Sequence, residues 1–246
     1  MSMIEMKDVV KKYDNGTTAL RGVSVQIEPG EFAYIVGPSG AGKSTFIRLL
    51  YREVKHDKGS LKVAGFDLDK IKKRDIPMLR RNVGVVFQDY KLLPKKTVYE
   101  NIAYAMQVIG ERRRNIKKRV MEVLDLVGLK HKVRSFPNEL SGGEQQRIGI
   151  VRAIIGEPKI LLMDEPFSAL DAISRKQLQA LTKDLHKEFG MTTIFVTHDT
   201  DEALKLGDRI AVLQDGEICQ VADPETILQT PSTDFVADLF GGAHHV

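Results

Sequence analysis

One glycine-rich segment constrains the fold of this chain more than any other feature. Residues 37–45 fit the pattern G-x-x-x-x-G-K-[ST], in which a loop joins a buried strand to a helix and turns backbone N–H groups toward a phosphate. The apolar run 31–36 predicts that strand, and residues 46–51 predict the helix; a plain glycine-rich turn at a helix start is the alternative. We expect Lys43 to reach the β- and γ-phosphates and the Ser44 hydroxyl to hold Mg²⁺. The expected phosphate-binding residues are Gly37, Pro38, Ser39, Gly40, Ala41, Gly42, Lys43, Ser44 and Thr45.

The composition is typical of a soluble globular protein, with 42% hydrophobic and 28% charged residues. The 246 residues allow one large domain, or a domain with a subdomain. No run approaches the ~18 apolar residues of a membrane-spanning helix, and the start lacks the apolar part of a signal peptide, so we expect a cytoplasmic or peripheral protein. A single cysteine, Cys219, excludes an internal disulfide. His244 and His245, at the end of the chain, are not expected to bind a metal.

Two carboxylates follow a second buried strand. The apolar run 160–163 is typical of a strand in a parallel sheet, and it leads directly into Asp164 and Glu165. Apolar residues followed by an acid form the Walker B pattern, in which the first carboxylate completes the shell of the magnesium ion. We expect Asp164 to hold Mg²⁺ and Glu165 to polarise the water that attacks the γ-phosphate. An acid pair that only caps a turn is the alternative.

Three further side chains stand at or after predicted strands. Gln88 lies at the end of the strand 82–89, where α/β sheets bind ligands, and we expect it to reach Mg²⁺ or the attacking water. His198 lies at the carboxyl end of the strand predicted over 191–199 and is expected beside the phosphate site. Tyr13 follows the first strand, predicted as an edge strand over 4–10, and has the flat ring needed to stack on a nucleotide base. The alternatives are an uncommitted glutamine, a structural histidine and a surface tyrosine.

A second helix start has the features of an anion site. Ser141 precedes a helix predicted to run to about Ile155, and Glu144 stands three residues later, which makes a capping box. Gly142 and Gly143 leave bare backbone amides at this N-terminus, where the helix dipole favours an anion. A plain cap explains the serine and the glutamate, but it does not explain the two glycines.

Residues 97–135 predict a helical insertion with an unusual charge distribution. The segment 111–119 carries six basic residues in nine. We expect it to be a solvated helix face. Contact with anionic lipid headgroups is the sharper alternative, and nucleic acid is a weak third, because no aromatic residues are interleaved for base stacking.

These motifs together resemble the nucleotide-binding domain of ABC ATPases over nearly the whole chain. The resemblance implies a head-to-tail dimer in which ATP lies between the Walker A loop of one subunit and the signature of the other, so that Ser141 and Gly143 contact the γ-phosphate of the partner's ATP. It also implies catalytic roles for Lys43, Gln88, Glu165 and His198. The matching positions are Tyr13 (A-loop), 37–45 (Walker A), Gln88 (Q-loop), 140–144 (signature), Asp164 and Glu165 (Walker B), 168–171 with Asp171 (D-loop) and His198 (switch loop).

At a finer level the two parts of the chain resemble different branches of this family. Residues 1 to about 147 resemble the cell-division ATPases of the FtsE family, on the stretches 13–16, 88–93 and 98–101. The rest is similar to ATPases of osmoprotectant importers of the glycine betaine/choline type, on the stretches 167–171, 197–204 and 231–236. The charge changes at the same place: residues 1–147 hold 29 Lys and Arg against 17 Asp and Glu, and residues 148–246 hold 8 against 16. The sequence therefore suggests a chimera joined between the signature and Walker B.

We expect an α/β fold with a P-loop NTPase core (residues 1–88 and 151–246), an antiparallel β subdomain and a helical subdomain at about 89–150. The expected function is Mg²⁺-dependent ATP hydrolysis at the cytoplasmic face of the cell membrane, coupled to an integral membrane partner. In this family the partner's groove lies between the Q-loop and the helical subdomain. Because both come from the FtsE-like part, an FtsX-like partner is favoured over an importer permease.

Two other classes of function remain as alternatives. The first is an ATP-gated clamp without hydrolysis, against which Glu165 argues. The second is a soluble ABC protein of translation or DNA, which usually has two ATPase domains or a long coiled coil. No nucleic-acid partner is expected.

Overall fold

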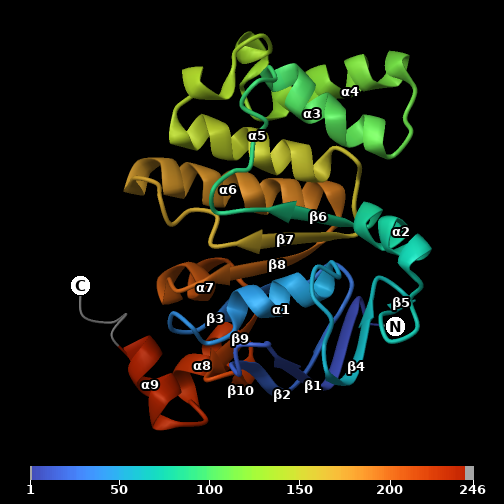
Figure 1. Cartoon of the computed structure of the whole chain (residues 1–246). Helices are drawn as coiled ribbons and strands as arrows, with labels where there is room; N and C mark the ends of the chain where they lie inside the picture. The colour runs from blue at the N-terminus through green and yellow to red at the C-terminus, as the bar shows by residue number, and fades with distance from the viewer. Residues whose placement is uncertain (1, 242–246) are drawn as a thin grey trace.

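Within residues 2–241, which the computed structural model describes, an antiparallel sheet of four strands stands beside a mostly parallel sheet of six (Figure 1). The small sheet has the order β2-β1-β4-β5. The prediction that the first strand lies at an edge is wrong, because β1 pairs with β2 on one side and with β4 on the other. Its alternating sequence reflects one buried face, which a central antiparallel strand can also have. The strands are β1 (Ile4–Lys12), β2 (Thr18–Ile27), β4 (Lys58–Val63) and β5 (Phe66–Asp67).

The large sheet has the order β10-β9-β3-β8-β7-β6, and every neighbouring pair is parallel except β10 with β9. Strands β3, β7 and β8 are buried along almost their whole length, since helices cover both faces of the sheet. The parallel core strands expected from the apolar runs are thus confirmed. The strands are β3 (Phe32–Val36), β6 (Val83–Val86), β7 (Ile160–Asp164), β8 (Thr192–Thr197), β9 (Arg209–Gln214) and β10 (Glu217–Ala222).

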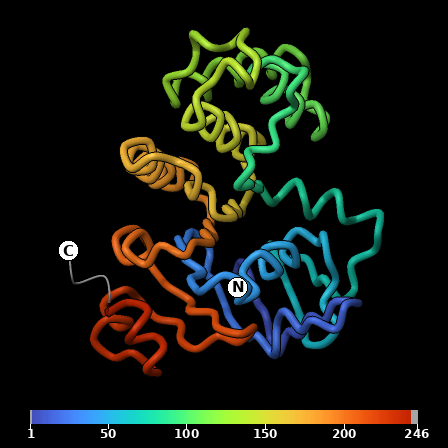
Figure 2. Tube along the Cα trace, turned by 60° about the vertical axis from the view of Figure 1, so that its left-hand side comes forward, coloured from blue at the N-terminus to red at the C-terminus, as the bar shows by residue number. Residues whose placement is uncertain are grey.

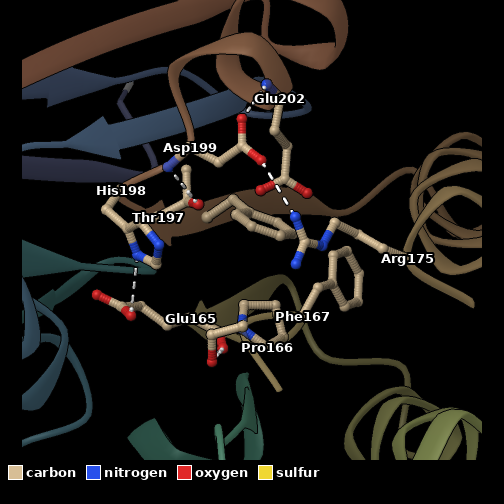
Figure 3. Close-up of a pocket in the computed structure, with 10 residues that line it drawn as sticks. Glu165, Pro166, Phe167, Arg175, Thr197, His198, Asp199 and Glu202 are labelled. Carbon is tan, nitrogen blue, oxygen red and sulfur yellow. Dashed lines mark hydrogen bonds and ion pairs between the residues drawn. The ribbon is translucent and has the colours of Figure 1, made fainter. Parts of the chain in front are cut away.

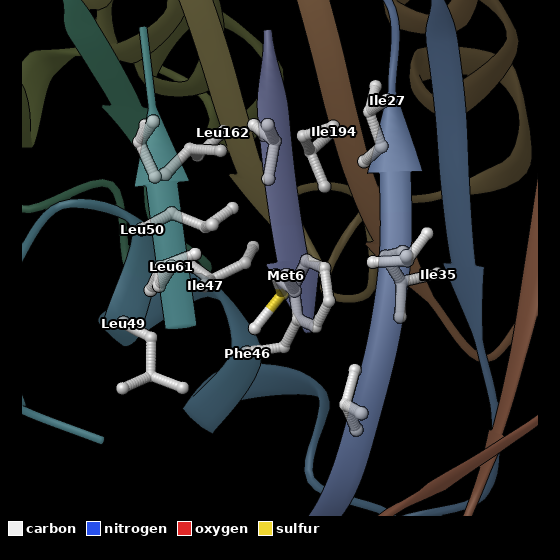
Figure 4. Close-up of a cluster of buried hydrophobic side chains, with 14 of the residues drawn as sticks. Met6, Ile27, Ile35, Phe46, Ile47, Leu49, Leu50, Leu61, Leu162 and Ile194 are labelled. Atoms are coloured by element: carbon white, nitrogen blue, oxygen red, sulfur yellow. The ribbon is translucent and has the colours of Figure 1, made fainter. Parts of the chain in front are cut away.

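Helix α1 (Lys43–Leu50) packs between the two sheets (Figure 4). Its apolar residues recur at helical spacing and face buried residues of both sheets. The helix is therefore fixed along its length, while its N-terminus lies beyond the carboxyl end of β3. The shared cluster includes Met6 and Leu61 of the small sheet, Ile35, Leu162 and Ile194 of the large sheet, and Phe46, Ile47 and Leu50 of α1.

The opposite face of the large sheet is covered by five helices of the described chain, which share a second buried cluster with Phe32, Tyr34 and Val36 of β3. This alternation along β3 follows from the period of two in a strand. The covering helices are α5 (Gly142–Ile154), α6 (Ala172–Phe189), α7 (Thr200–Leu206), α8 (Pro224–Gln229) and α9 (Asp234–Gly241).

A helical layer lies at one end of the molecule (Figure 2). Helices α3 (Val98–Val108) and α4 (Arg113–Leu126) pack there on α5, which places Ile150 and Ile154 in the sheet cluster and Ile148 and Val151 in the helical one. The helical insertion predicted from residues 97–135 is thus present. The proposed boundaries of the subdomains, at residues 88 and 151, stay a prediction.

Short elements complete the described chain. Helix α2 (Ile76–Arg81) has Pro77 in its first turn, where no intrahelical N–H bond is lost, so Pro77 begins a helix rather than interrupting one. No helix in residues 2–241 is long and apolar enough to cross a membrane. The prediction for His244 and His245 falls outside the described residues. Single 3₁₀ turns are η1 (Lys73–Asp75), η2 (Lys130–Lys132) and η3 (Pro137–Glu139).

Candidate nucleotide-binding site

The glycine-rich loop ends on Gly42, which caps α1. Gly42 has a φ of 105°, in the left-handed region that favours glycine, and a Cβ atom there would overlap the carbonyl oxygen of Ala19. Glycine is therefore required both by the backbone conformation and by the close approach of β2. No side chain of residues 2–241 caps this helix start, which leaves its N-terminus as a site for an anion.

Lys43 lies inside its own loop. Its side chain is 5% exposed, and Nζ donates to the carbonyl oxygens of Gly37 at 2.7 Å and Pro38 at 2.9 Å. Nζ also lies 3.6 Å from Oε1 of Glu165, which joins the loop to the end of β7. The ammonium group thus stands between the predicted phosphate loop and the predicted base.

Ser44 and Asp164 meet although 120 residues separate them. The Ser44 hydroxyl donates to Oδ1 of Asp164 at 3.2 Å. Burial raises the pKa of Asp164, and the Ser44 hydrogen bond opposes this. Within residues 2–241 no group of three or more His, Cys, Asp and Glu side chains could hold a metal. Two protein oxygens nevertheless suit Mg²⁺, because that ion is usually bound by one or two carboxylates together with waters and substrate phosphates.

Glu165 lies at the edge of the pocket drawn in Figure 3, next to His198. Its backbone has a φ of 45°, which is uncommon for a residue other than glycine, and its N–H donates to the Val196 carbonyl at 2.9 Å. The carboxylate contacts Lys43 through Oε1, and Oε2 lies 3.3 Å from Nδ1 of His198. Such unusual backbone conformations gather at active sites, where they aim a side chain.

An open groove of ≈ 480 Å³ runs beside these residues. Tyr13 lies on its wall, and the Tyr13 hydroxyl is 3.2 Å from Oγ1 of Thr45. The sequence did not indicate Arg21 and Asp215, which also line the groove, because neither belongs to a recognisable motif. Only the fold brings β2 and the β9–β10 turn to the phosphate loop.

The remaining predicted residues lie outside this groove. Gln88 is exposed beyond the end of β6 and has no hydrogen bond to Ser44 or Asp164. Asp171 is the N-cap of α6, and its Oδ1 accepts from the backbone N–H groups of Ile173 and Ser174. The carboxylate of Asp171 thus has a structural partner in addition to the nucleotide contact expected for it.

The second helix start, at α5, has the predicted capping box. The N–H of Glu144 donates to Oγ of Ser141, and the Glu144 carboxylate accepts from the Ser141 N–H. Ser141 is exposed, and Gly142 and Gly143 are half-buried near Tyr90 and Ser174. None of the three residues lines the groove of its own chain.

A buried acid lies behind the site. Glu202 of α7 is 4% exposed, and its Oε1 accepts from Nε2 of Gln179 at 2.9 Å. Burial raises its pKa to about 7; the neighbouring Asp199 also raises it, while Arg175 and the hydrogen bonds of Gln179 and Thr197 lower it.

We expect this acid to make stability depend on pH. Because the pKa of Glu202 rises from 4.5 to about 7 on folding, the folded state binds an extra proton between these values, and its stability falls as the pH rises through that window. The fall amounts to about 3 kcal/mol of unfolding free energy. Glu202→Gln should lack this contribution, as measured by urea unfolding from about pH 5 to about pH 8. Parallel pH profiles for the two proteins would contradict the prediction.

Three comparisons relate the chain to known proteins. The family model described as "ABC transporter" matches residues 20–168. The cell division ATP-binding protein FtsE of Streptococcus pneumoniae serotype 2 is 69% identical over 218 residues, 89% of this chain and 94% of the relative. The carnitine transport ATP-binding protein OpuCA of Listeria monocytogenes is 41% identical over 240 residues, 97% of this chain and 60% of the relative. A solved dimer of the ATP-binding cassette MJ0796 in a post-hydrolysis state, bound to ADP and Pi, has a TM-score of 0.81 at 33% identity and covers 90% of this chain and 99% of its own.

The comparisons also bear on the suspected chimera. An alignment of 218 residues within a chain of 246 necessarily crosses residue 147, so one FtsE relative spans both sides of the suspected join. Two origins are therefore not needed to explain the sequence. The phosphate loop, the paired carboxylates and the likeness to MJ0796 agree with the family match, and the chain belongs to the family of ABC transporter ATPases.

Proposed function

We propose that this protein is the ATP-binding and ATP-hydrolysing subunit of a cell-division ABC complex. The FtsE relative supports the cell-division role, since its 69% identity exceeds the 41% of the carnitine transport relative. The observation that carries the enzymatic part is the position of Glu165, held between Lys43 and His198 beside the phosphate loop. An ATP-gated clamp would not need a carboxylate in that position.

In this proposal the loop 37–45 and the N-terminus of α1 bind the phosphates, and Lys43 turns toward the β- and γ-phosphates. Ser44 and Asp164 hold Mg²⁺, with Gln88 approaching from the end of β6 once the nucleotide is bound. Bound Mg²⁺ would neutralise phosphate charge and offset the repulsion between Asp164 and Glu165. Tyr13 lies on the groove wall, where a base can stack.

Glu165 acts as the general base. Its carboxylate accepts a proton from the water that attacks the γ-phosphate, and the Lys43 ammonium lies 3.6 Å from Oε1 of the same carboxylate. His198 contacts the other oxygen of the same carboxylate, and in this role it orients the base and stabilises the γ-phosphate. General-base catalysis of this kind typically contributes about 10²- to 10⁴-fold in rate.

The second helix start supports a head-to-tail dimer. Ser141, Gly142 and Gly143 form a capped, partly exposed helix N-terminus outside the groove of their own chain. In a head-to-tail dimer these amides would meet the γ-phosphate on the partner subunit, and Asp171 lies nearby at the start of α6. The solved relative is itself described as a dimer.

A separate groove of ≈ 680 Å³ supports a membrane partner at the cytoplasmic face. It is lined by residues of α2, β6, α3 and α5. They include the exposed apolar side chains of Tyr104 and Val108 and the basic side chains of Arg80, Arg81 and Arg152. Such a surface fits an amphipathic segment with acidic ends. We propose that an FtsX-like membrane protein supplies this segment.

The base is tested by Glu165→Gln. We expect ATP binding to remain and steady-state phosphate release to fall at least about 100-fold, because the amide cannot accept the proton. Glu188→Gln, an exposed residue of α6, serves as the control and should match the wild type. Equal rates of phosphate release for the wild type and Glu165→Gln would show that Glu165 is not the base, and background release from both would favour the clamp.

The dimer is tested by mixing two inactive variants. Lys43→Ala and Ser141→Arg should each abolish activity, yet their mixed dimer contains one intact composite site. We expect the mixture to regain up to about a quarter of the wild-type rate, because half of the dimers are mixed and each has one intact site. Mixed dimers without any recovered ATPase activity would place both residues in one site of a single chain.

The partner groove is tested by Tyr104→Glu combined with Val108→Glu. We expect this variant to keep ATP binding but to lose capture of an FtsX-like membrane protein from a detergent extract, because buried charge opposes apolar docking. Leu126→Glu, at the end of α4 and outside the groove, is the matched control. Unchanged capture, or capture of an importer permease instead, would refute the assignment.

A further inference from the structure

We propose that Arg175 is a positioning residue that fixes the switch-loop His198 against Glu165. This inference rests on the proposed function, because it assigns a residue that acts behind the base and the histidine. Arg175 lies on α6, one turn after Asp171, and has no place in the motifs that identify the site.

The guanidinium joins two loops that border the site. Nη2 donates to the carbonyl oxygen of Leu170 at 3.3 Å. Nη1 lies 3.6 Å from Oδ2 of Asp199 (Figure 3). Asp199 directly follows His198 and caps α7, since its Oδ1 accepts from the N–H of Glu202 at 3.0 Å. One side chain thus connects the loop 168–171 to the start of α7.

His198 needs such support because packing does not hold it. Its side chain is 63% exposed, and the one hydrogen bond its ring makes within residues 2–241 is to Glu165, at 3.3 Å. The direction of the imidazole therefore depends on the backbone on either side. On the N-terminal side of His198, Thr197 lies in the buried strand β8, and its Oγ1 accepts from the Asp199 N–H at 3.0 Å. On the C-terminal side, the backbone is held through the side chain of Asp199.

The charges around Arg175 make its removal costly. Asp199 and the buried Glu202 both face this one guanidinium. The other polar groups around Glu202 are Gln179, the Thr197 hydroxyl and the buried hydroxyl of Tyr34. Without Arg175, the Asp199 carboxylate would lose the guanidinium that it contacts where the start of α7 meets the switch loop. Lysine keeps the charge but lacks the planar fork that reaches both Leu170 and Asp199.

A small cavity shows how close this group lies to the reacting residues. It has a volume of ≈ 30 Å³, and Glu165, Arg175, His198 and Glu202 all line it. The guanidinium thus stands directly behind the base and the histidine. A shift of the Asp199 backbone would carry His198 away from Oε2 of Glu165.

The test compares Arg175→Gln with Lys176→Gln, which removes a positive charge from an exposed neighbour on the same helix. We expect Arg175→Gln to lower kcat about tenfold while KM for ATP changes less than about twofold, because the loss concerns the reacting groups rather than nucleotide binding. Arg175→Lys should give an intermediate kcat, and Lys176→Gln should match the wild type.

The second readout is the imidazole resonance of His198 in the NMR spectrum, assigned with His198→Ala. We expect it to shift and broaden in Arg175→Gln but not in Lys176→Gln. A wild-type kcat, or a lowered kcat with an unchanged His198 resonance, would overturn the inference. If Arg175→Gln does not fold, Arg175→Lys decides by the same two measurements. Failure of the proposed function would appear separately, as equal rates for the wild type and Glu165→Gln, and the His198 resonance would still decide this inference.

Discussion

The parallel pairing of β3, β8 and β7 is the constraint on which the candidate site depends. The carboxyl ends of these neighbouring strands are Val36, Thr197 and Asp164, and parallel strands bring such ends to one edge of the sheet. The phosphate loop, His198 and Glu165 therefore lie close together in the fold although they are far apart in the sequence. A shift of β7 by one residue would turn its side chains to the opposite faces of the sheet and would separate Asp164 from Ser44 and Glu165 from Lys43.

This edge concentrates opposite charges at short distances. The Lys43 ammonium lies between the loop carbonyls and Glu165, while burial, and after it the neighbouring Glu165 carboxylate, raise the pKa of Asp164. Two adjacent carboxylates beside a phosphate site are stable only with a cation nearby. The proposed Mg²⁺ would therefore offset the charge of the carboxylates as well as that of the substrate phosphates. Arg175 has the corresponding role behind the site, where its positive charge lies near the carboxyl groups of Asp199 and Glu202.

The parts of the site that the sequence predicts well are those whose chemistry requires residues close together in the chain. The phosphate loop, the pair Asp164–Glu165 and the capping box at Ser141 are such local patterns. Pairing between distant segments has no local signal, which explains why β1 was wrongly expected at an edge and why Arg21 and Asp215 were not expected in the groove. Arg175 and Glu202 were missed for the same reason, since α6 and α7 meet only in the folded chain.

Helix α5 links the two surfaces that the proposed function requires. Its N-terminus carries the residues proposed to meet the partner's ATP, and Arg152 and Ala153 near its other end line the proposed partner groove. With a rise of about 1.5 Å per residue, the two ends lie roughly 20 Å apart. Arg152 also donates to the carbonyl oxygens of Tyr90 and Lys91, in the loop that follows Gln88. If ATP binding displaced Ser141, α5 would move as a rigid body. The wall of the proposed partner groove and the loop that follows Gln88 would therefore move together.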